Sequence, residues 1–358
     1  MMKKLKDQRN ISTYNQRSKQ QETVSYVTDS RIKEDVWLPL PLENSQETFE
    51  TLHLWTQIVG KIRLAQSPMV NHWWQVPFYL TSRGLTTSPI PYGMATFQID
   101  FDFLDHQLII SADDGNIKSI ALASRSVADF YHELFNTLQS LGFNIKIWTL
   151  PVEVQDPIPF DKDYKHSSYP KDTIYCFWKI LLQVKKVFEE FRSIYIGKCS
   201  PVHFFWGSFD LAVTRFSGRR APEHPGGIPN LSDWVVREAY SHECSSCGFW
   251  PGFGSDTGAA FYSYAYPEPK GFKEYNIKTN GAFYNNKLLE FILPYDSFRK
   301  MKDPDKVLMQ FLQETYEAGA NFGKWNRYEL ERTEYLSYST PENRDAPTFP
   351  APSREGSE

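Results

Sequence analysis

Two stretches of the chain resemble each other, and this resemblance limits the folds that are open to it. The first is GKIRLAQSPMVNHWWQVPFYL, from Gly60 to Leu80, and the second is GKCSPVHFFWGSFDL, from Gly197 to Leu211. Gly-Lys, Ser-Pro, a Val, a His, two aromatic residues and Phe-x-Leu recur in the same order. A duplicated segment keeps the fold of its original, so this internal duplication predicts two units of one architecture.

Residues 35–150 carry the pattern of a first α+β unit. Phe97, Ile99 and Phe101 alternate with polar residues, which is typical of a half-buried strand. Asp113–Gly115 lies between two apolar runs and predicts a hairpin turn. The expected elements are a helix after a capping box at Asn44, strands over 72–85 and 95–103, two strands around the hairpin turn, a helix from Ser126 to Gly142 and a strand over 144–150.

A second unit with the same order of elements is expected over 172–325. The Pro-rich residues 151–171 separate it from the first unit as a linker. Its expected elements are a helix over 174–197, strands over 202–216, 235–242, 259–266 and 288–293, and a helix over 304–322. The predicted fold class is therefore α+β, with two pseudo-repeated units that each hold an antiparallel sheet of about four strands covered by helices.

Both ends of the chain lack the apolar residues that a core requires. We expect a disordered arm over the polar residues 1–34 and a disordered tail over the Pro-rich residues 338–358. The sequence has no secretory signal, no apolar run of about 18 residues and too few cysteines for a disulfide framework. These features predict a soluble cytoplasmic protein with reduced thiols. The net charge of -4 argues against a nucleic-acid-binding surface, and no membrane partner is expected.

Aromatic residues are abundant, and polar residues interrupt them. Phe, Trp and Tyr make up 16% of the chain, which indicates an aromatic core or a cleft lined by rings. We expect a cleft between the two units that binds a small polar or anionic ligand. The candidate ligand-binding residues are His72, Trp74, Arg83, His203, Trp206, Asp210, Arg215 and Arg219.

The same residues have a structural interpretation. Asp210 lies in an apolar strand, so a buried ion pair with a neighbouring Arg would explain it, and the histidines would then hydrogen-bond the backbone. Arg83 and Arg215 are also offset by one position relative to the two similar stretches. That offset places them on opposite faces of their strands and weakens the symmetry of the cleft.

A His-x-Cys-x-x-Cys pattern offers a candidate metal site. His242, Cys244 and Cys247 have a spacing that zinc sites use, and His224 or a water molecule would complete the ligand set. A redox pair and ordinary loop cysteines are the alternatives, because a single Cys-x-x-Cys is a weak signal. Zinc is therefore the one cofactor that the sequence suggests.

Three long strings resemble an uncharacterised bacterial family that is known only as a domain of unknown function. They are NHWWQVPFYLTSRGLTT, HFFWGSFDLAVTRFSGR and CGFWPGFG, and the resemblance covers about residues 45–325. It implies a soluble bacterial protein and brings no activity or site residue with it. The function expected from the residues is small-molecule binding, with or without catalysis. A protein–protein interaction scaffold and a zinc enzyme are the alternatives.

Overall fold

The computed structural model describes four stretches of the chain, residues 36–40, 45–227, 231–252 and 258–332. They belong to a compact unit that begins at Val36. The arm expected over 1–34, the tail expected over 338–358 and the capping residue Asn44 lie outside the described residues.

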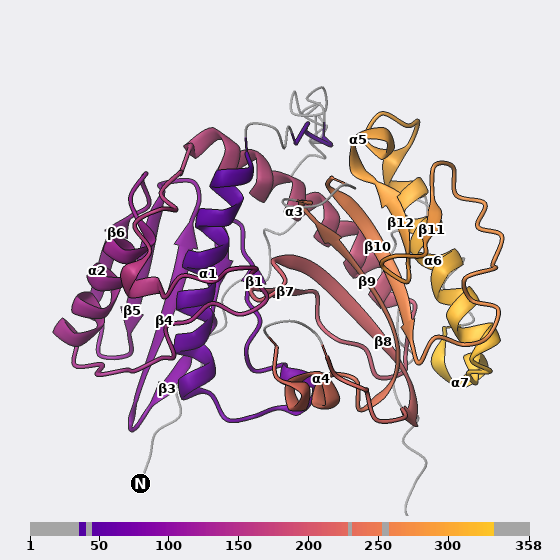
Figure 1. Ribbon diagram of the computed structural model, residues 1–358, viewed down its shortest axis with the longest axis horizontal. Coiled ribbons are helices and arrows are strands. Elements are labelled where there is room, and N and C mark those ends of the chain that lie inside the picture. Colours follow the sequence, from indigo (N-terminus) through magenta and orange to yellow (C-terminus); the bar gives the residue numbers. More distant parts are fainter. Residues whose placement is uncertain (1–35, 41–44, 228–230, 253–257, 333–358) are drawn as a thin grey trace, which may run out of the picture. The chain divides into compact units, whose positions relative to one another are not determined.

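The first half of the chain forms an antiparallel sheet (Figure 1). Its spatial order is β1 (Tyr79–Leu80), β2 (Gly84–Thr86), β4 (Ala95–Asp102), β5 (Gln107–Ala112) and β6 (Ile117–Ala121), and β3 (Ile90–Tyr92) also pairs with β4. Phe97, Ile99 and Phe101 of β4 are buried, whereas Gln98 between them keeps solvent contact, as the alternating pattern predicted. Gly115, at a φ of 88°, lies in the predicted β5–β6 hairpin turn.

Helices α1 (Gln46–Gln66) and α2 (Val127–Ser140) pack on this sheet and on each other. The hydroxyl of Ser126 caps α2 by accepting a hydrogen bond from the amide of Asp129 at 3.0 Å, as predicted. The ring of Trp55 on α1 stacks on that of Phe130 on α2, with 4.5 Å between their centroids. These contacts fix the position of α1, which also holds the loops of the candidate site.

The second half forms a sheet in the order β7 (His203–Phe205), β8 (Asp210–Arg220), β9 (His242–Trp250), β10 (Ala260–Tyr266), β12 (Glu290–Pro294) and β11 (Phe283–Asn285). Two long helices accompany it, α3 (Lys171–Ser193) and α6 (Pro304–Phe322). The shorter helices are α4 (Asp233–Ala239), α5 (Tyr295–Phe298), α7 (Arg327–Leu330) and the 3₁₀ turns η3 (Asn71–Trp73) and η4 (Phe160–Lys162). No helix in the described stretches combines the length and the apolar character needed to cross a bilayer.

The two faces of the second sheet have different environments because side chains alternate along each strand. Val213, Phe249 and Phe261 are buried on the face that contacts α3 and α6. Figure 1 shows α3 behind β8, β9 and β10, so the reader looks onto the opposite face. We call that opposite face the open face; it carries Asp210, Ser246, Gly248, Tyr262, Tyr264 and Glu290.

The two sheets meet edge to edge through one residue of each half. Phe78, just before β1, and Phe204 on β7 exchange both backbone hydrogen bonds at 2.9 Å. Both side chains are fully buried in a hydrophobic core that continues through the two halves. The junction therefore lies directly beside His203 in the second half and shortly after His72 in the first.

The two halves share an order of elements. With β3, β11 and the short helices set aside, each half runs through a helix, an antiparallel meander of consecutive strands and a second helix. The residue matches do not follow this order, because Gly60 lies inside α1 whereas Gly197 follows the end of α3. His72 likewise lies in η3 and His203 in a strand. The duplication inferred from those matches is not confirmed.

The sequence predictions for the main helices and for the strands over 95–103, 259–266 and 288–293 are confirmed. The estimate of about four strands for each sheet is wrong, since the described residues form six strands in each. The strand expected over 144–150 is also wrong. The ammonium group of Lys61, in α1, donates to the carbonyl oxygen of Trp148 at 3.2 Å and to that of Leu150. These two carbonyl groups therefore bond to a side chain and not to the backbone of a neighbouring strand.

Three further strand predictions are wrong in part. Residues 72–85 are interrupted because His72 and Trp73 adopt positive φ angles of 57° and 63° and turn the chain. The strand over 202–216 is split into β7 and β8 by a turn at Phe209, which has a φ of 59°. Most of the segment expected as a strand over 235–242 belongs to α4.

The expected linker, residues 151–171, is irregular apart from η4. It nevertheless contributes Phe160 and Tyr169 to the core, where both side chains are buried. The segment is therefore anchored beside α1, and its first residues approach the second sheet.

Candidate functional site

Three of the predicted ligand residues come together beside the junction of the sheets. The ring of Trp74 lies 5.5 Å from that of His72 and 5.8 Å from that of His203, measured between centroids. His203 is fully buried, and its Nε2 lies 3.4 Å from the hydroxyl of Tyr79. Its Nδ1 has no hydrogen-bond partner among the described residues. Both histidines of this cluster are buried, whereas Trp74 and Tyr79 are partly exposed.

Replacement of His203 by Phe is expected to reduce the acid sensitivity of the fold. Burial lowers the pKa of His203 from 6.5 to about 3. Below pH 6.5 the unfolded chain therefore binds a proton at this residue, whereas the folded protein keeps the imidazole neutral. Stability is therefore lost as the pH falls, by about 2 kcal/mol between pH 7 and pH 5. Urea unfolding at both pH values measures this loss, and an equal loss in the His203→Phe variant would contradict the assignment.

His72 uses both ring nitrogens within the protein. Its Nδ1 lies 3.0 Å from the carbonyl oxygen of Ala239, so Nδ1 carries the proton, and its Nε2 accepts from Lys198 Nζ at 2.8 Å. Burial lowers the pKa of His72, and the Lys198 cation lowers it further. A neutral His72 therefore ties η3 to the end of α4.

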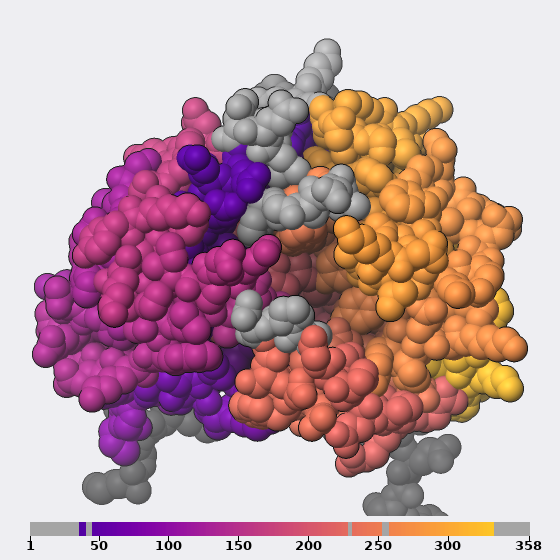
Figure 2. Space-filling model, viewed as in Figure 1, coloured from indigo at the N-terminus to yellow at the C-terminus, as the bar shows by residue number. Residues whose placement is uncertain are grey.

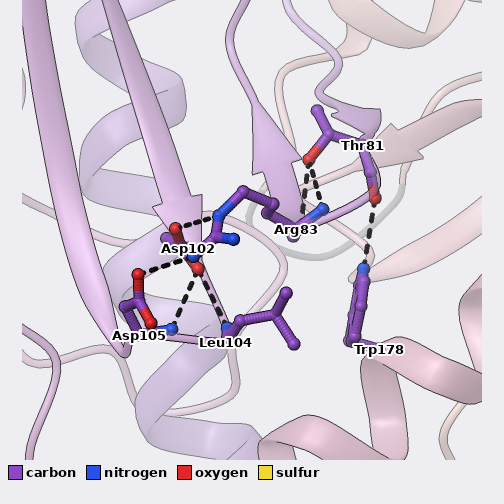
Figure 3. A network of polar contacts seen from close by, with 7 residues as sticks. Thr81, Arg83, Asp102, Leu104, Asp105 and Trp178 are labelled. Atoms are coloured by element: carbon purple, nitrogen blue, oxygen red, sulfur yellow. Dashed lines mark hydrogen bonds and ion pairs between the residues drawn. The ribbon is translucent and has the colours of Figure 1, made fainter.

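Arg83 stabilises a turn of the first sheet (Figure 3). Its guanidinium donates to Asp102 Oδ2 at 2.5 Å and to Asp105 Oδ2 at 2.6 Å. Burial acts to raise the pKa of Asp102, but the hydrogen bond from Arg83 and the amides of Asp105 and Leu104 outweigh it and lower that pKa. The structure therefore gives Arg83 a partner outside the predicted cleft.

Trp206, Arg215 and Arg219 also have partners within the fold. The indole of Trp206 donates to Val76 O at 3.0 Å. Arg215 is almost fully buried, with its guanidinium carbon 3.4 Å from the ring centroid of Phe191. The exposed Arg219 donates to Glu243 Oε2 at 2.6 Å and clamps β8 to β9. The structure thus does not bring these three residues into one site.

The structure does not assemble the predicted zinc ligands. Cys244 and Cys247 are three positions apart on β9, so their side chains lie on opposite faces of the sheet. Cys247 Sγ contacts Val213 O at 3.7 Å, and burial raises the pKa of both thiols. Across the described stretches, no group of three or more His, Cys, Asp and Glu side chains is arranged to hold a metal ion. The structure therefore does not bring His242, Cys244 and Cys247 together as a metal site.

Asp210 is the predicted residue that faces the open side of the second sheet. Its two carboxylate oxygens accept hydrogen bonds from the hydroxyls of Ser208 and Tyr262. Tyr262 reaches Asp210 by lying across Gly248, where a Cβ would collide with the tyrosine ring. Burial raises the pKa of Asp210. The buried ion pair with an Arg, which the sequence offered as an alternative, does not form.

Two further carboxylates, which sequence reasoning missed, lie beside Asp210. Glu153 comes from the irregular segment after the first half, and Glu290 begins β12. Burial raises the pKa of each to about 7, and the charge of Asp210 adds to the shift. Glu153 nevertheless keeps an exposed surface and Glu290 a partly exposed one. Groups that protein surrounds but solvent still reaches are typical of a concave site.

Helix α1 positions the loops that carry two of these carboxylates. Gln57 exchanges two hydrogen bonds with the backbone of Val152, at 2.8 and 2.9 Å, and so fixes the residue before Glu153. His53 Nε2 donates to Gly207 O at 2.8 Å in the turn that precedes Asp210. A Cβ at Gly207 would collide with the carboxylate of Glu153, so the two loops touch at this glycine.

A hollow lies over the open face. In Figure 2, which has the same view as Figure 1, its floor shows the colours of the second sheet between the magenta residues on the left and the orange ones on the right. Tyr262 and Tyr264 contribute half-buried rings, nearly parallel at 13° and 6.1 Å apart. Tyr240 joins them through a 2.8 Å contact between its hydroxyl and that of Tyr264.

The hollow combines groups that bind polar molecules with groups that exchange protons near neutral pH. Carboxyl groups with a pKa of about 7 hold and release a proton over the physiological range, as Glu153 and Glu290 would. Tyrosine rings supply an apolar floor with hydroxyl groups at its edge. The sequence signal for this site was the polar Asp210 within an aromatic strand; Glu153 and Glu290 carried no comparable signal.

Comparison with known proteins identifies the family of the chain but gives it no activity. No curated protein and no solved structure matches the chain. The model of a family of unknown function, DUF5996, matches residues 37–332. That match spans most of the chain and includes both sheets and the residues that line the hollow. The protein therefore belongs to the DUF5996 family of unknown function.

Proposed function

We propose that the protein binds a small polar ligand in the hollow over the open face of the second sheet. The ligand would contact Glu153, Asp210, Tyr262, Tyr264 and Glu290. The observation that carries the proposal is the convergence of three carboxylates and a tyrosine floor from four separate segments onto one accessible face. Convergent polar groups in a concave site are the usual form of a ligand site.

A purely structural role explains these carboxylates poorly. The surroundings of Glu153 and Glu290 disfavour their charged forms, so a structural role would call for an ion pair to stabilise each carboxylate. Neither residue forms an ion pair with a described residue. The backbone is also strained on both sides of the contact at Gly207, with positive φ angles of 56° at Glu153 and 59° at Phe209. Such strain costs on the order of 1 kcal/mol for each residue and is common at functional sites.

Removal of the Tyr262 ring is expected to abolish ligand binding while the protein stays folded. Equilibrium dialysis against a defined mixture of amino acids, sugars, nucleotides, organic acids and amines provides the measurement. The wild-type protein should retain at least one compound, and Tyr262→Ala should retain it at least tenfold less. Glu153→Gln, which preserves shape, should show the same loss.

Tyr328→Ala provides the matched control, because Tyr328 is 80% exposed on α7 and far along the chain from the hollow. It should bind as the wild type does. The proposal is wrong if the wild type retains no compound, or if the folded Tyr262 and Glu153 variants retain it as well as the wild type.

Two finer expectations from the sequence belong with this proposal. The shared order of helix, meander and helix supports an ancient duplication, and relatives whose two halves resemble each other more closely would test it. The four cysteines are free, which supports a reducing compartment such as the cytoplasm. Localisation of a tagged full-length chain would test the second expectation.

A further inference from the structure

Among the residues that the structure describes, the charged group that acts on Glu153 and Glu290 is another carboxylate, Asp210. Burial raises the pKa of Glu153 and of Glu290 most, and the negative charge of Asp210 raises both pKa values further. No positively charged group among the described residues lowers either pKa. Burial raises the pKa of Tyr262, and the charges of Asp210 and Glu290 raise it further. The three carboxylates therefore share one electrostatic environment, and the described residues supply them with no counter-ion.

Three cations of the second half, Arg215, Arg219 and Lys198, have partners outside the hollow. Arg215 lies on the helix-covered face, one residue out of phase with the open face, and donates to Phe191 O. Arg219 pairs with Glu243, and Lys198 contacts His72. In the stretches that the structure describes, no ion pair involves Glu153, Asp210 or Glu290.

The three segments that separate the described stretches contain no basic residue. Residues 41–44 are Pro-Leu-Glu-Asn, residues 228–230 are Ile-Pro-Asn, and residues 253–257 are Phe-Gly-Ser-Asp-Thr. The missing positive charge is therefore absent from the neighbouring parts of the sequence as well.

The tyrosine floor provides a second and independent reason to expect a cation. The electron-rich face of a tyrosine ring attracts an ammonium group, by about 0.5–1 kcal/mol at exposed sites and about 2 kcal/mol when the site is dry. Tyr262 and Tyr264 present half-buried rings to the hollow, and the carboxylate of Glu153 makes no hydrogen bond to a described residue.

We infer that the ligand of the hollow is a small organic cation with an alkylammonium group, held between the free carboxylates of Glu153 and Glu290 and the faces of the tyrosine rings. This inference rests on the proposed function and names its ligand class. The negative charge of the hollow thus favours a cationic ligand, whereas the sequence suggested a polar or anionic one. An organic cation fits better than a metal ion because, among the described residues, these carboxylates are too widely spaced to form a metal-ligand set.

The affinity for such a cation should rise with pH. Glu153 and Glu290 have a pKa of about 7 in the empty site, so at pH 6 most of both groups are protonated and at pH 8 most are charged. The other groups that face them are Asp210 of β8, Tyr262 and Tyr264 of β10, and Tyr240 after α4. The tyrosines stay neutral throughout this range because burial raises their pKa values.

Calorimetric titration of the full-length protein with choline and with 3,3-dimethyl-1-butanol tests the inference, because the two molecules differ in charge but hardly in shape. Butylammonium serves as a second cation, and glucose and magnesium chloride serve as neutral and metal probes. At pH 8 a cation should bind at least tenfold more tightly than the neutral alcohol, and at pH 6 its affinity should fall at least fivefold. Glu153→Gln should weaken cation binding at least tenfold at pH 8.

Glu329→Gln is the matched control, since Glu329 is exposed on α7 and should not affect binding. Equal affinity for choline and its neutral isostere, binding of glucose instead, or stoichiometric binding of magnesium would overturn the cation assignment. If neither cation binds while another compound of the dialysis mixture does, the cation assignment fails and the proposed function stands. If no compound binds in either experiment, the proposed function fails.

Discussion

Replacement of Gly60 by Ala is expected to lower the free energy of unfolding by about 2 kcal/mol, because the new methyl group has no space. Gly60 lies inside α1, and a Cβ there would overlap the indole ring of Trp206. Overpacking of this kind costs up to about 3 kcal/mol. The better helix propensity of Ala returns about 1 kcal/mol. Urea unfolding followed by circular dichroism measures the net change.

The overlap at Gly60 should also weaken ligand binding, because Trp206 is anchored at both ends. Its indole nitrogen donates to Val76 O, and the next residue, Gly207, accepts from His53 and touches Glu153. Displacement of the indole therefore moves the turn before Asp210. In the dialysis experiment, the Gly60→Ala variant should retain less ligand than the wild type.

A double-mutant cycle with Trp206→Phe separates this contact from general damage to α1. The smaller ring leaves space for the methyl group, so Gly60→Ala should cost less in the Trp206→Phe background. Equal losses of unfolding free energy in both backgrounds would show that Gly60 and Trp206 do not act on each other.

The periodic elements could be predicted from the sequence because their signals are local. The alternation in β4, the Asp113–Gly115 turn and the Ser126 cap each depend on residues within a few positions, and all three are confirmed. The failures have long-range causes. Residues 144–150 look like a strand, but a lysine far earlier in the chain, Lys61, takes up their carbonyl groups. Tertiary contacts of this kind leave no pattern in the segment itself.

The candidate site was predictable only in part for the same reason. Asp210 stood out because a carboxylate within an aromatic strand demands an explanation. Glu153 and Glu290 did not, because glutamate is common in irregular segments and at strand ends. Their proximity to Asp210 depends on the edge-to-edge junction at Phe78 and Phe204, which places the segment after the first half against the second sheet. No sequence spacing encodes that arrangement.

Replacement of both Glu153 and Glu290 by Gln is expected to make the ligand-free protein more stable at pH 8 and to abolish ligand binding. Both pKa values are raised from 4.5 to about 7, so the folded protein keeps protons that the unfolded chain releases between these values. The free energy of unfolding therefore falls as the pH rises from 4.5 to 7, and it stays reduced above pH 7. Gln is neutral at every pH, so the double variant avoids this loss.

Thermal unfolding at pH 8 and at pH 5 checks this expectation. The double variant should melt a few degrees above the wild type at pH 8, and the difference should shrink at pH 5, where the wild-type carboxyl groups are protonated. Glu329→Gln should change neither value. If the carboxylates held the fold together, the double variant would instead melt at a lower temperature at pH 8. Residues that lower stability while creating a binding site are characteristic of function, so the sign of this shift separates the two roles.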